Sequence, residues 1–141
     1  MISIRKFNHI FDYEIIKIWF NDWGWTYPEL DQIPEESWIA CINDVPVAFS
    51  CFGKTDTSIA IMGFTISRKE HIENKNEAID TVINHIFNRV KECGFKYLHY
   101  YTDHVGMVLR MERLGMQVTD RASAYILLKN IQGTNCTFYD E

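Results

Sequence analysis

The stretch from Ile59 to Gly94 constrains the fold most, because it reads as a strand, a polar loop and a long helix in succession. Ile59–Ile66 is rich in β-branched and apolar residues between polar clusters, which is typical of a buried strand. The helix that follows has an apolar stripe, which predicts packing against a sheet. The stripe consists of Ile79, Val82, Ile83, Ile86, Phe87 and Val90. Asn74 and Asn76 mark the start of this helix as candidate caps, and Gly94 marks its end.

The start of this helix is the most favourable ligand site that the sequence offers. A helix that begins just beyond a central strand presents free backbone N–H groups and the positive end of its dipole, which favours phosphate or another anion. The alternative is a helix cap with no anion. Gly63, inside the strand, indicates a bulge, a close approach by a ligand or simple packing.

Composition indicates one globular domain over residues 1–130, followed by a polar tail over 131–141. The chain has 141 residues, of which 47% are hydrophobic, and a net charge of −5. An acidic chain without clustered Lys and Arg argues against a nucleic-acid or anionic-membrane partner. No spanning or leader-like apolar segment is visible, so we expect a cytoplasmic protein. No Cys or His spacing suits a metal ion, and we expect reduced cysteines.

The remaining periodic segments complete an α/β (α+β) architecture with seven strands. Besides Ile59–Ile66, the predicted strands are Ile2–Phe7, Trp38–Ile42, Val45–Phe52, Lys96–Tyr101, Met116–Thr119 and Ser123–Leu128. Two shorter helices are predicted over Asp12–Phe20 and His104–Leu114. Asn43 and Asp44 suit the tight turn of a hairpin, and the long helix is a crossover between parallel strands. The expected sheet is therefore mixed, mostly antiparallel and flanked by helices.

The loop after the first helix is acidic and aromatic. No basic residue lies between Lys17 and Lys54, and its aromatic residues include Trp23, Trp25 and Tyr27. A solvated acidic face is the simpler interpretation, and a mouth that attracts a cationic substrate is the alternative. Loop aromatics often line a pocket or contact a partner. We therefore treat these three residues as candidates for substrate binding, or for contact with a homodimer or protein partner.

This order of elements, read with LRMERLGM near the end, resembles the GNAT superfamily of N-acetyltransferases. Phe64–Ile79 lies without a gap over the family's strand, pyrophosphate loop and helix start, and Leu109–Met116 resembles its later helix. The tryptophan-rich and proline-rich segment also looks like that of short phage-carried GNAT-like proteins. The resemblance implies a V-shaped splay between the fourth and fifth strands that holds acetyl-CoA, with no metal.

The resemblance also implies cofactor contacts. Backbone groups of Phe64, Thr65 and Ile66 would hold the thioester. The loop would hold the diphosphate, and its residues are His71, Ile72, Glu73, Asn74, Lys75 and Asn76. Both family glycines are replaced there by asparagine, which reaches the left-handed region more readily than other side-chained residues. Lys75 would add favourable charge, and Glu73 would oppose it.

Two further family positions depart from the pattern. Met111 aligns with the proton-donating tyrosine, and a thioether has no proton to give. His104 aligns with the usual asparagine, and it is a candidate base. Tyr100 and Tyr101 lie on alternate faces of a predicted strand, so one of them is expected to reach the cleft as the acid. Direct attack by a bound amine, with water carrying protons, needs no side-chain donor.

The sequence therefore predicts an acetyl-CoA-dependent N-acetyltransferase that acts on a primary amine of a small molecule or a protein. The alternative is an inactive GNAT-fold binding or interaction protein that uses the Trp23, Trp25 and Tyr27 surface.

Overall fold

The computed structural model describes residues 1–119, which divide into two units, Met1–Tyr100 and a second that begins at Tyr101. The first unit contains β1 (Ile2–Lys6), α1 (Asp12–Trp23), the short 3₁₀ helix η1 (Leu30–Gln32), β2 (Glu36–Ile42), β3 (Val45–Gly53), β4 (Ile59–Ser67), α2 (Lys75–Glu92) and β5 (Tyr97–His99). The second contains α3 (Val105–Arg113). Within the described part, no helix has the length and apolar character needed to cross a membrane.

The sheet has the order β1-β2-β3-β4-β5. Neighbouring strands run antiparallel except β4 and β5, which are parallel across the α2 crossover. This confirms the mixed, mostly antiparallel sheet and the crossover. Asn43 and Asp44 both have positive φ, 50° and 66°, as the predicted hairpin turn requires.

The prediction of seven strands is not confirmed. Residues 116–119 form no strand. The Met116 N–H instead donates to the Met111 carbonyl at 2.9 Å, so the chain there completes the end of α3 rather than a sheet. The predicted Ser123–Leu128 strand lies outside the described residues. The structure therefore has five strands over residues 1–119.

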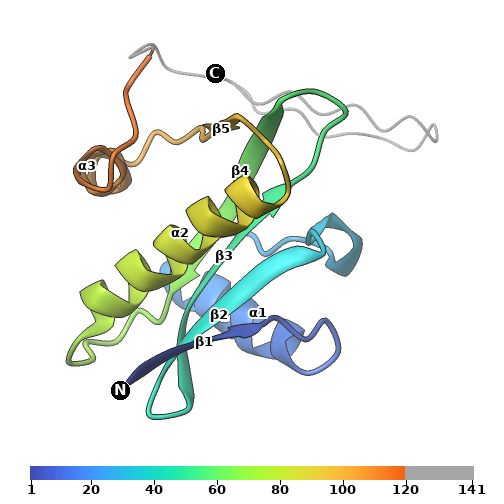
Figure 1. Cartoon of the computed structure of the whole chain (residues 1–141). Helices are drawn as coiled ribbons and strands as arrows, with labels where there is room; N and C mark the ends of the chain where they lie inside the picture. Colours follow the sequence, from blue (N-terminus) through green and yellow to red (C-terminus); the bar gives the residue numbers. More distant parts are fainter. Residues whose placement is uncertain (120–141) are drawn as a thin grey trace, which may run out of the picture. The chain divides into compact units, whose positions relative to one another are not determined.

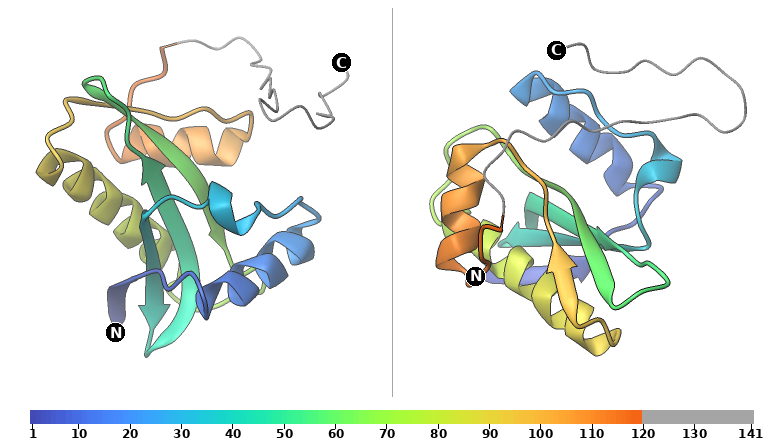
Figure 2. Two further views of the ribbon diagram at one scale, coloured as in Figure 1. Left: turned by 90° about the vertical axis from the view of Figure 1, so that its right-hand side faces the viewer. Right: turned by 90° about the horizontal axis from the view of Figure 1, so that it is seen from above.

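Helices α1 and α2 cover opposite faces of the sheet (Figures 1 and 2). On the α1 face, Ile16, Trp19 and Phe20 pack with Phe49 and Ile66 in one buried cluster. On the other face, α2 buries Ala78, Ile79, Val82, Ile83, Ile86 and Val90. The apolar stripe predicted for α2 is thus confirmed, with Phe87 only half-buried.

Helix α1 is three residues longer than predicted, because Trp23 belongs to the helix and not to the loop. The helix ends where Gly24 takes a left-handed conformation, φ 76°, and the Trp25 N–H closes the last turn on the Phe20 carbonyl at 2.9 Å. A glycine after a helical stripe is a stop signal. Gly24 therefore marked the true end of the helix.

The acidic segment between Lys17 and Lys54, for which a solvated face is the simpler interpretation, includes one buried and paired carboxylate, Glu36. Glu36 is buried at the start of β2, and it accepts two hydrogen bonds from the Arg89 guanidinium of α2, at 3.0 and 2.7 Å. This bidentate pair, helped by a bond from the Trp38 indole, holds the pKa of Glu36 at about 2. The pair ties α2 to the start of β2.

We predict that Glu36→Gln lowers the free energy of unfolding at pH 7 by about 2–3 kcal/mol, because it leaves Arg89 without its buried carboxylate. A carboxyl group with a lowered folded-state pKa stabilises the protein above its unfolded value, 4.5 for Glu36, and loses that contribution as the pH falls to about 2. Urea unfolding of the variant and wild type should therefore converge between pH 4.5 and 2. Glu92→Gln removes the exposed partner of the same Arg89 and should cost less than about 0.5 kcal/mol. Equal losses would contradict the assignment.

Candidate functional site

A β-bulge interrupts β4 in the middle of its pairing with β3. Ser50 pairs with Thr65 and Phe52 pairs with Met62, so Cys51 alone stands opposite Gly63 and Phe64. One extra residue in a strand increases its local twist and bends it. Of the interpretations left open for Gly63, the bulge is therefore confirmed.

Close packing explains why glycine occupies this position. A Cβ atom at Gly63 would lie 2.8 Å from the Cys51 Sγ, inside any acceptable contact. The same sulfur lies 3.6 Å from the Phe64 carbonyl oxygen, to which it donates. Burial raises the pKa of the Cys51 thiol to about 12, so this group is a packing element and not a nucleophile.

Strands β4 and β5 part just before the bulge. They pair only from Ile59 with Tyr97 to Ile61 with His99, while β4 continues to Ser67. Within residues 1–119, the β5 side of Met62–Ser67 therefore has no paired strand. This is the arrangement expected of a splay. Because β5 ends at His99, Tyr100 and Tyr101 follow the strand, and strand alternation no longer assigns either ring to a face.

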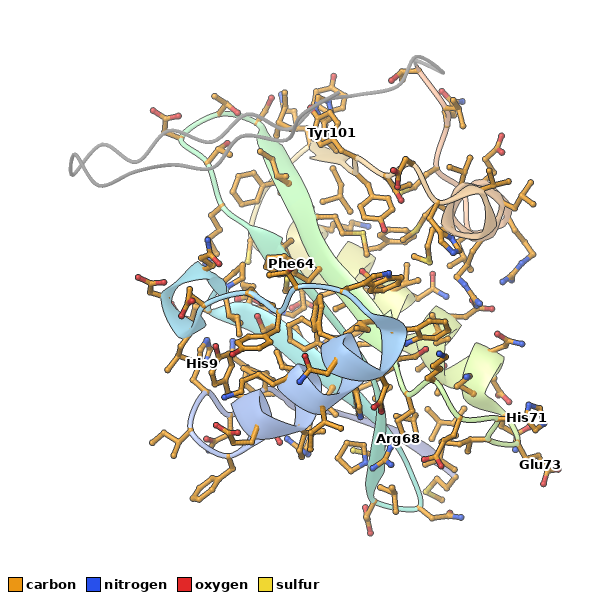
Figure 3. The ribbon with its side chains drawn as sticks, turned by 180° about the vertical axis from the view of Figure 1, so that it is seen from behind. His9, Phe64, Arg68, His71, Glu73 and Tyr101 are labelled. Atoms are coloured by element: carbon orange, nitrogen blue, oxygen red, sulfur yellow. The ribbon has the colours of Figure 1, made fainter. Side chains whose placement is uncertain are left out.

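The side chains of β4 beyond the bulge are used in packing. Phe64 and Ile66 join the cluster under α1, and Phe64 lies edge-on to Phe20 with ring centroids 6.0 Å apart (Figure 3). The Thr65 hydroxyl is hydrogen-bonded to the buried Ser50 hydroxyl at 2.8 Å. A ligand beside Phe64–Ile66 would therefore contact mainly the backbone of these residues.

The loop after β4 leads into α2 through a left-handed residue. Asn74 has φ 67° and ψ 13°, the conformation in which a glycine is usually found. Its carbonyl accepts the first helical bond, from the Ala78 N–H at 3.0 Å. Its side chain makes no capping hydrogen bond, so the prediction that the Asn74 side chain caps the helix is wrong. His71 and Glu73 are exposed and project outward from this loop (Figure 3).

Lys75 binds carbonyl groups of the same loop, and Arg68 binds a carbonyl group of β3. The Lys75 ammonium donates to the carbonyl oxygens of Arg68 at 2.9 Å, Lys69 at 3.4 Å and Glu70 at 3.0 Å. The Arg68 Nε donates to the Pro46 carbonyl at 2.6 Å, and its guanidinium lies over the Trp19 ring. The charge expected from Lys75 is therefore directed into the loop itself.

The tryptophan-rich segment meets the end of β4, which the sequence did not indicate. The Trp23 indole N–H donates to the Ser67 carbonyl at 2.8 Å, and the Trp23 ring stacks on Trp25 with centroids 5.4 Å apart. The Lys69 ammonium lies 5.8 Å from the Trp23 ring. Trp23 is half-buried, whereas Trp25 and Tyr27 are exposed. The loop that leads into α2 and the Trp23–Trp25 pair thus both lie at the same end of β4.

In the second unit, His104 caps α3. Its Nδ1 accepts from the Met107 N–H at 3.1 Å, so in the neutral ring Nε2 carries the proton and the lone pair is already engaged. This arrangement leaves His104 poorly suited to act as a base. Met111, at the position of the family tyrosine, is buried. Residues 1–119 contain no group of three or more side chains placed to hold a metal ion.

No protein-family model matches this chain, and no curated protein matches it. Solved structures, in contrast, do match this chain. One is an acetyltransferase of the GNAT family from Staphylococcus aureus Mu50, with 16% identity over 92% of this chain and 95% of that chain, at a TM-score of 0.64. The chain has a GNAT-like fold.

Two further matches were solved with ligands. N-acetylglutamate synthase from Neisseria gonorrhoeae, complexed with coenzyme A and N-acetyl-glutamate, is 14% identical over 80% of this chain and 28% of that chain, at a TM-score of 0.63. AAC(6')-Iy, in complex with the bisubstrate analogue CoA-S-monomethyl-acetylneamine, is 14% identical over 92% of this chain and 99% of that chain, also at 0.63. At these identities, the likeness is one of GNAT fold.

We predict that Gly63→Ala lowers the free energy of unfolding by about 1–3 kcal/mol, because the new methyl group overlaps the Cys51 sulfur. Cys51→Ala removes that sulfur, so the double variant should lose at least about 1 kcal/mol less than the sum of the two single variants. Urea unfolding of all four proteins measures this coupling. Additive losses would mean that the tight contact at the bulge is not what requires glycine.

Proposed function

We propose that this protein is an acetyl-CoA-dependent N-acetyltransferase that acts on a primary amine of a small molecule or a protein. The observation that supports this most strongly is the shape of β4. The bulge at Gly63 and Phe64 lies next to the point where β4 leaves β5, and the loop over residues 68–74 joins the end of β4 to the left-handed start of α2. An open strand backbone and a helix N-terminus are thus supplied by one continuous segment.

The two ends of acetyl-CoA are chemically suited to the two ends of this segment. The diphosphate would lie at the start of α2, where amide N–H groups and the helix dipole favour an anion, beside residues His71–Asn76. The thioester carbonyl would accept a hydrogen bond from the backbone around Phe64–Ile66. His104 and Met111, in the second unit, are further cofactor contacts that we propose from the family resemblance alone.

Transfer forms an amide bond to the amine nitrogen and breaks the carbon–sulfur bond, so the amine must lose a proton and the departing thiolate must gain one. We propose direct attack by the neutral amine on the thioester. Tyr100 and Tyr101 are the candidate donors to the thiolate, and water is the alternative carrier. His104 is the weaker catalytic candidate, because its accepting nitrogen already caps α3.

We propose that the acceptor amine is bound on the α1 side, against Trp23, Trp25 and Tyr27. Phe64, Phe20 and Trp25 form a chain of edge-on aromatic contacts from the bulge to this surface, with centroids 6.0 and 6.4 Å apart. Aromatic faces attract cations, and the acidic residues of the surrounding segment act in the same direction. Both features favour a cationic amine as the acceptor.

An inactive binding protein is the second candidate. The family tyrosine is replaced by the buried Met111, and the accepting nitrogen of His104 is occupied. Such a protein would use the exposed Trp25 and Tyr27 as a contact surface.

Titration with acetyl-CoA, followed by a thiol-release assay over a panel of amines, tests the proposal. Binding with turnover of at least one amine is the expected result. Absence of both would contradict the proposal and favour the second candidate. Binding without turnover would indicate either an acceptor outside the panel or an acyl-CoA sensor.

We predict that Asn76→Glu weakens acetyl-CoA binding at least about 100-fold, because it places a carboxylate beside the expected diphosphate. The fold should be retained, since a negative charge in the first turn suits the helix dipole. Asn84→Glu is the matched control, because it makes the same change two turns along α2 on an exposed position. Calorimetry should show the control binding as wild type does. Equal weakening in both variants would contradict a diphosphate site at the start of α2.

We predict that one of Tyr100→Phe and Tyr101→Phe reduces kcat about 10²-fold or more, because the thiolate loses its proton donor. Each variant keeps the ring, so the KM for acetyl-CoA should change little. Steady-state thiol release at several pH values measures both constants. If both variants retain the full rate, no tyrosine acts as the acid, and proton transfer through water remains.

A further inference from the structure

Lys75 occupies a position where a cation is unfavourable unless something compensates it. It is the first residue of α2, at the positive end of the helix dipole. Its ammonium has three N–H donors, and the carbonyl oxygens of Arg68, Lys69 and Glu70 accept from it at 2.9, 3.4 and 3.0 Å. Three converging carbonyl dipoles supply the missing compensation.

Further hydrogen bonds hold the two ends of the loop between β4 and α2. The Lys75 N–H donates to the Ile72 carbonyl at 3.1 Å, which closes the turn through Asn74. At the other end, the Arg68 N–H donates to the Val47 carbonyl at 2.9 Å, and the Trp23 indole holds the Ser67 carbonyl. Carbonyls 67 to 70 are therefore each bound by a side chain from a neighbouring helix.

We propose that Lys75 is a positioning residue for the anion-binding loop. Its ammonium draws the carbonyl oxygens of residues 68–70 together and neutralises them, so that their negative ends do not face an anion at the start of α2. It thereby presets a loop whose shape glycines provide in the family that this chain resembles. The link to coenzyme A rests on the function proposed above, whereas the hold on the loop does not.

The matched pair Lys75→Met and Lys69→Met tests this proposal. Both remove one positive charge next to the same loop, but the Lys69 ammonium lies over the Trp23 ring, whereas the Lys75 ammonium binds three loop carbonyls. In the ligand-free protein, amide hydrogen exchange of Arg68 and Lys75, whose N–H groups donate to the Val47 and Ile72 carbonyls, should be at least about 10-fold faster in Lys75→Met and unchanged in Lys69→Met. Lys75→Gln keeps an amide donor, so its exchange rate should lie between those of the two methionine variants. It replaces Lys75→Met in the test if Lys75→Met does not fold.

Ligand binding provides the second measurement. Lys75→Met should weaken binding of coenzyme A about 10-fold or more, and binding of pantetheine, which lacks the diphosphate, by less than about 2-fold. Lys69→Met should weaken the binding of coenzyme A by less than about 3-fold.

The outcomes separate the two proposals. Unchanged exchange in both Lys75 variants would overturn the positioning role. Equal weakening of coenzyme A by the two methionine variants would also overturn it, because charge alone would then explain the effect. Faster exchange in Lys75→Met, in a protein whose wild type does not bind coenzyme A, would support the hold on the loop and overturn the proposed function.

Discussion

The tight contact between Gly63 and Cys51 is the constraint on which the rest of the structure depends. Two residues of β4 stand opposite Cys51 at the bulge, and a Cβ atom at Gly63 would lie 2.8 Å from the Cys51 sulfur, so only glycine fits there. β5 follows β4 only as far as Ile61. The second half of β4 therefore keeps one partner, β3, and its backbone on the other side is left for something other than a strand.

The consequences continue to the end of β4. Side chains from both helices hold the loop there, with Trp23 at the end of α1 and Lys75 at the start of α2. The aromatic segment that follows α1 is thus fixed beside the loop that begins α2, although about 50 residues separate them in sequence. A ligand with an anionic end and an acyl end matches this layout better than a purely apolar or purely cationic ligand.

Much of the fold could be predicted from the sequence, because local periodicity decided it. The stripe of α2, the Asn43–Asp44 turn and the parallel crossover are all properties of short segments. Predictions failed where a distant partner decides the outcome. Glu36 belongs to the acidic segment and carries no local sign of burial, because its partner, Arg89, lies 53 residues away in the sequence. The sequence around Lys75 does not predict that its ammonium binds carbonyl groups five to seven residues earlier in the chain. Residues 116–119, predicted as a strand, form none, and the Met116 N–H closes the end of α3 instead.

The central claim is that β4 and the start of α2 together form a coenzyme A site without the usual glycines. A crystal structure of the protein grown with millimolar coenzyme A tests it most directly. The account predicts the diphosphate within hydrogen-bonding distance of backbone N–H groups in residues 71–76, and the sulfur beside the backbone of Phe64–Ile66. Clear density for this loop with no ligand beside it, or coenzyme A bound on another surface, would contradict the account.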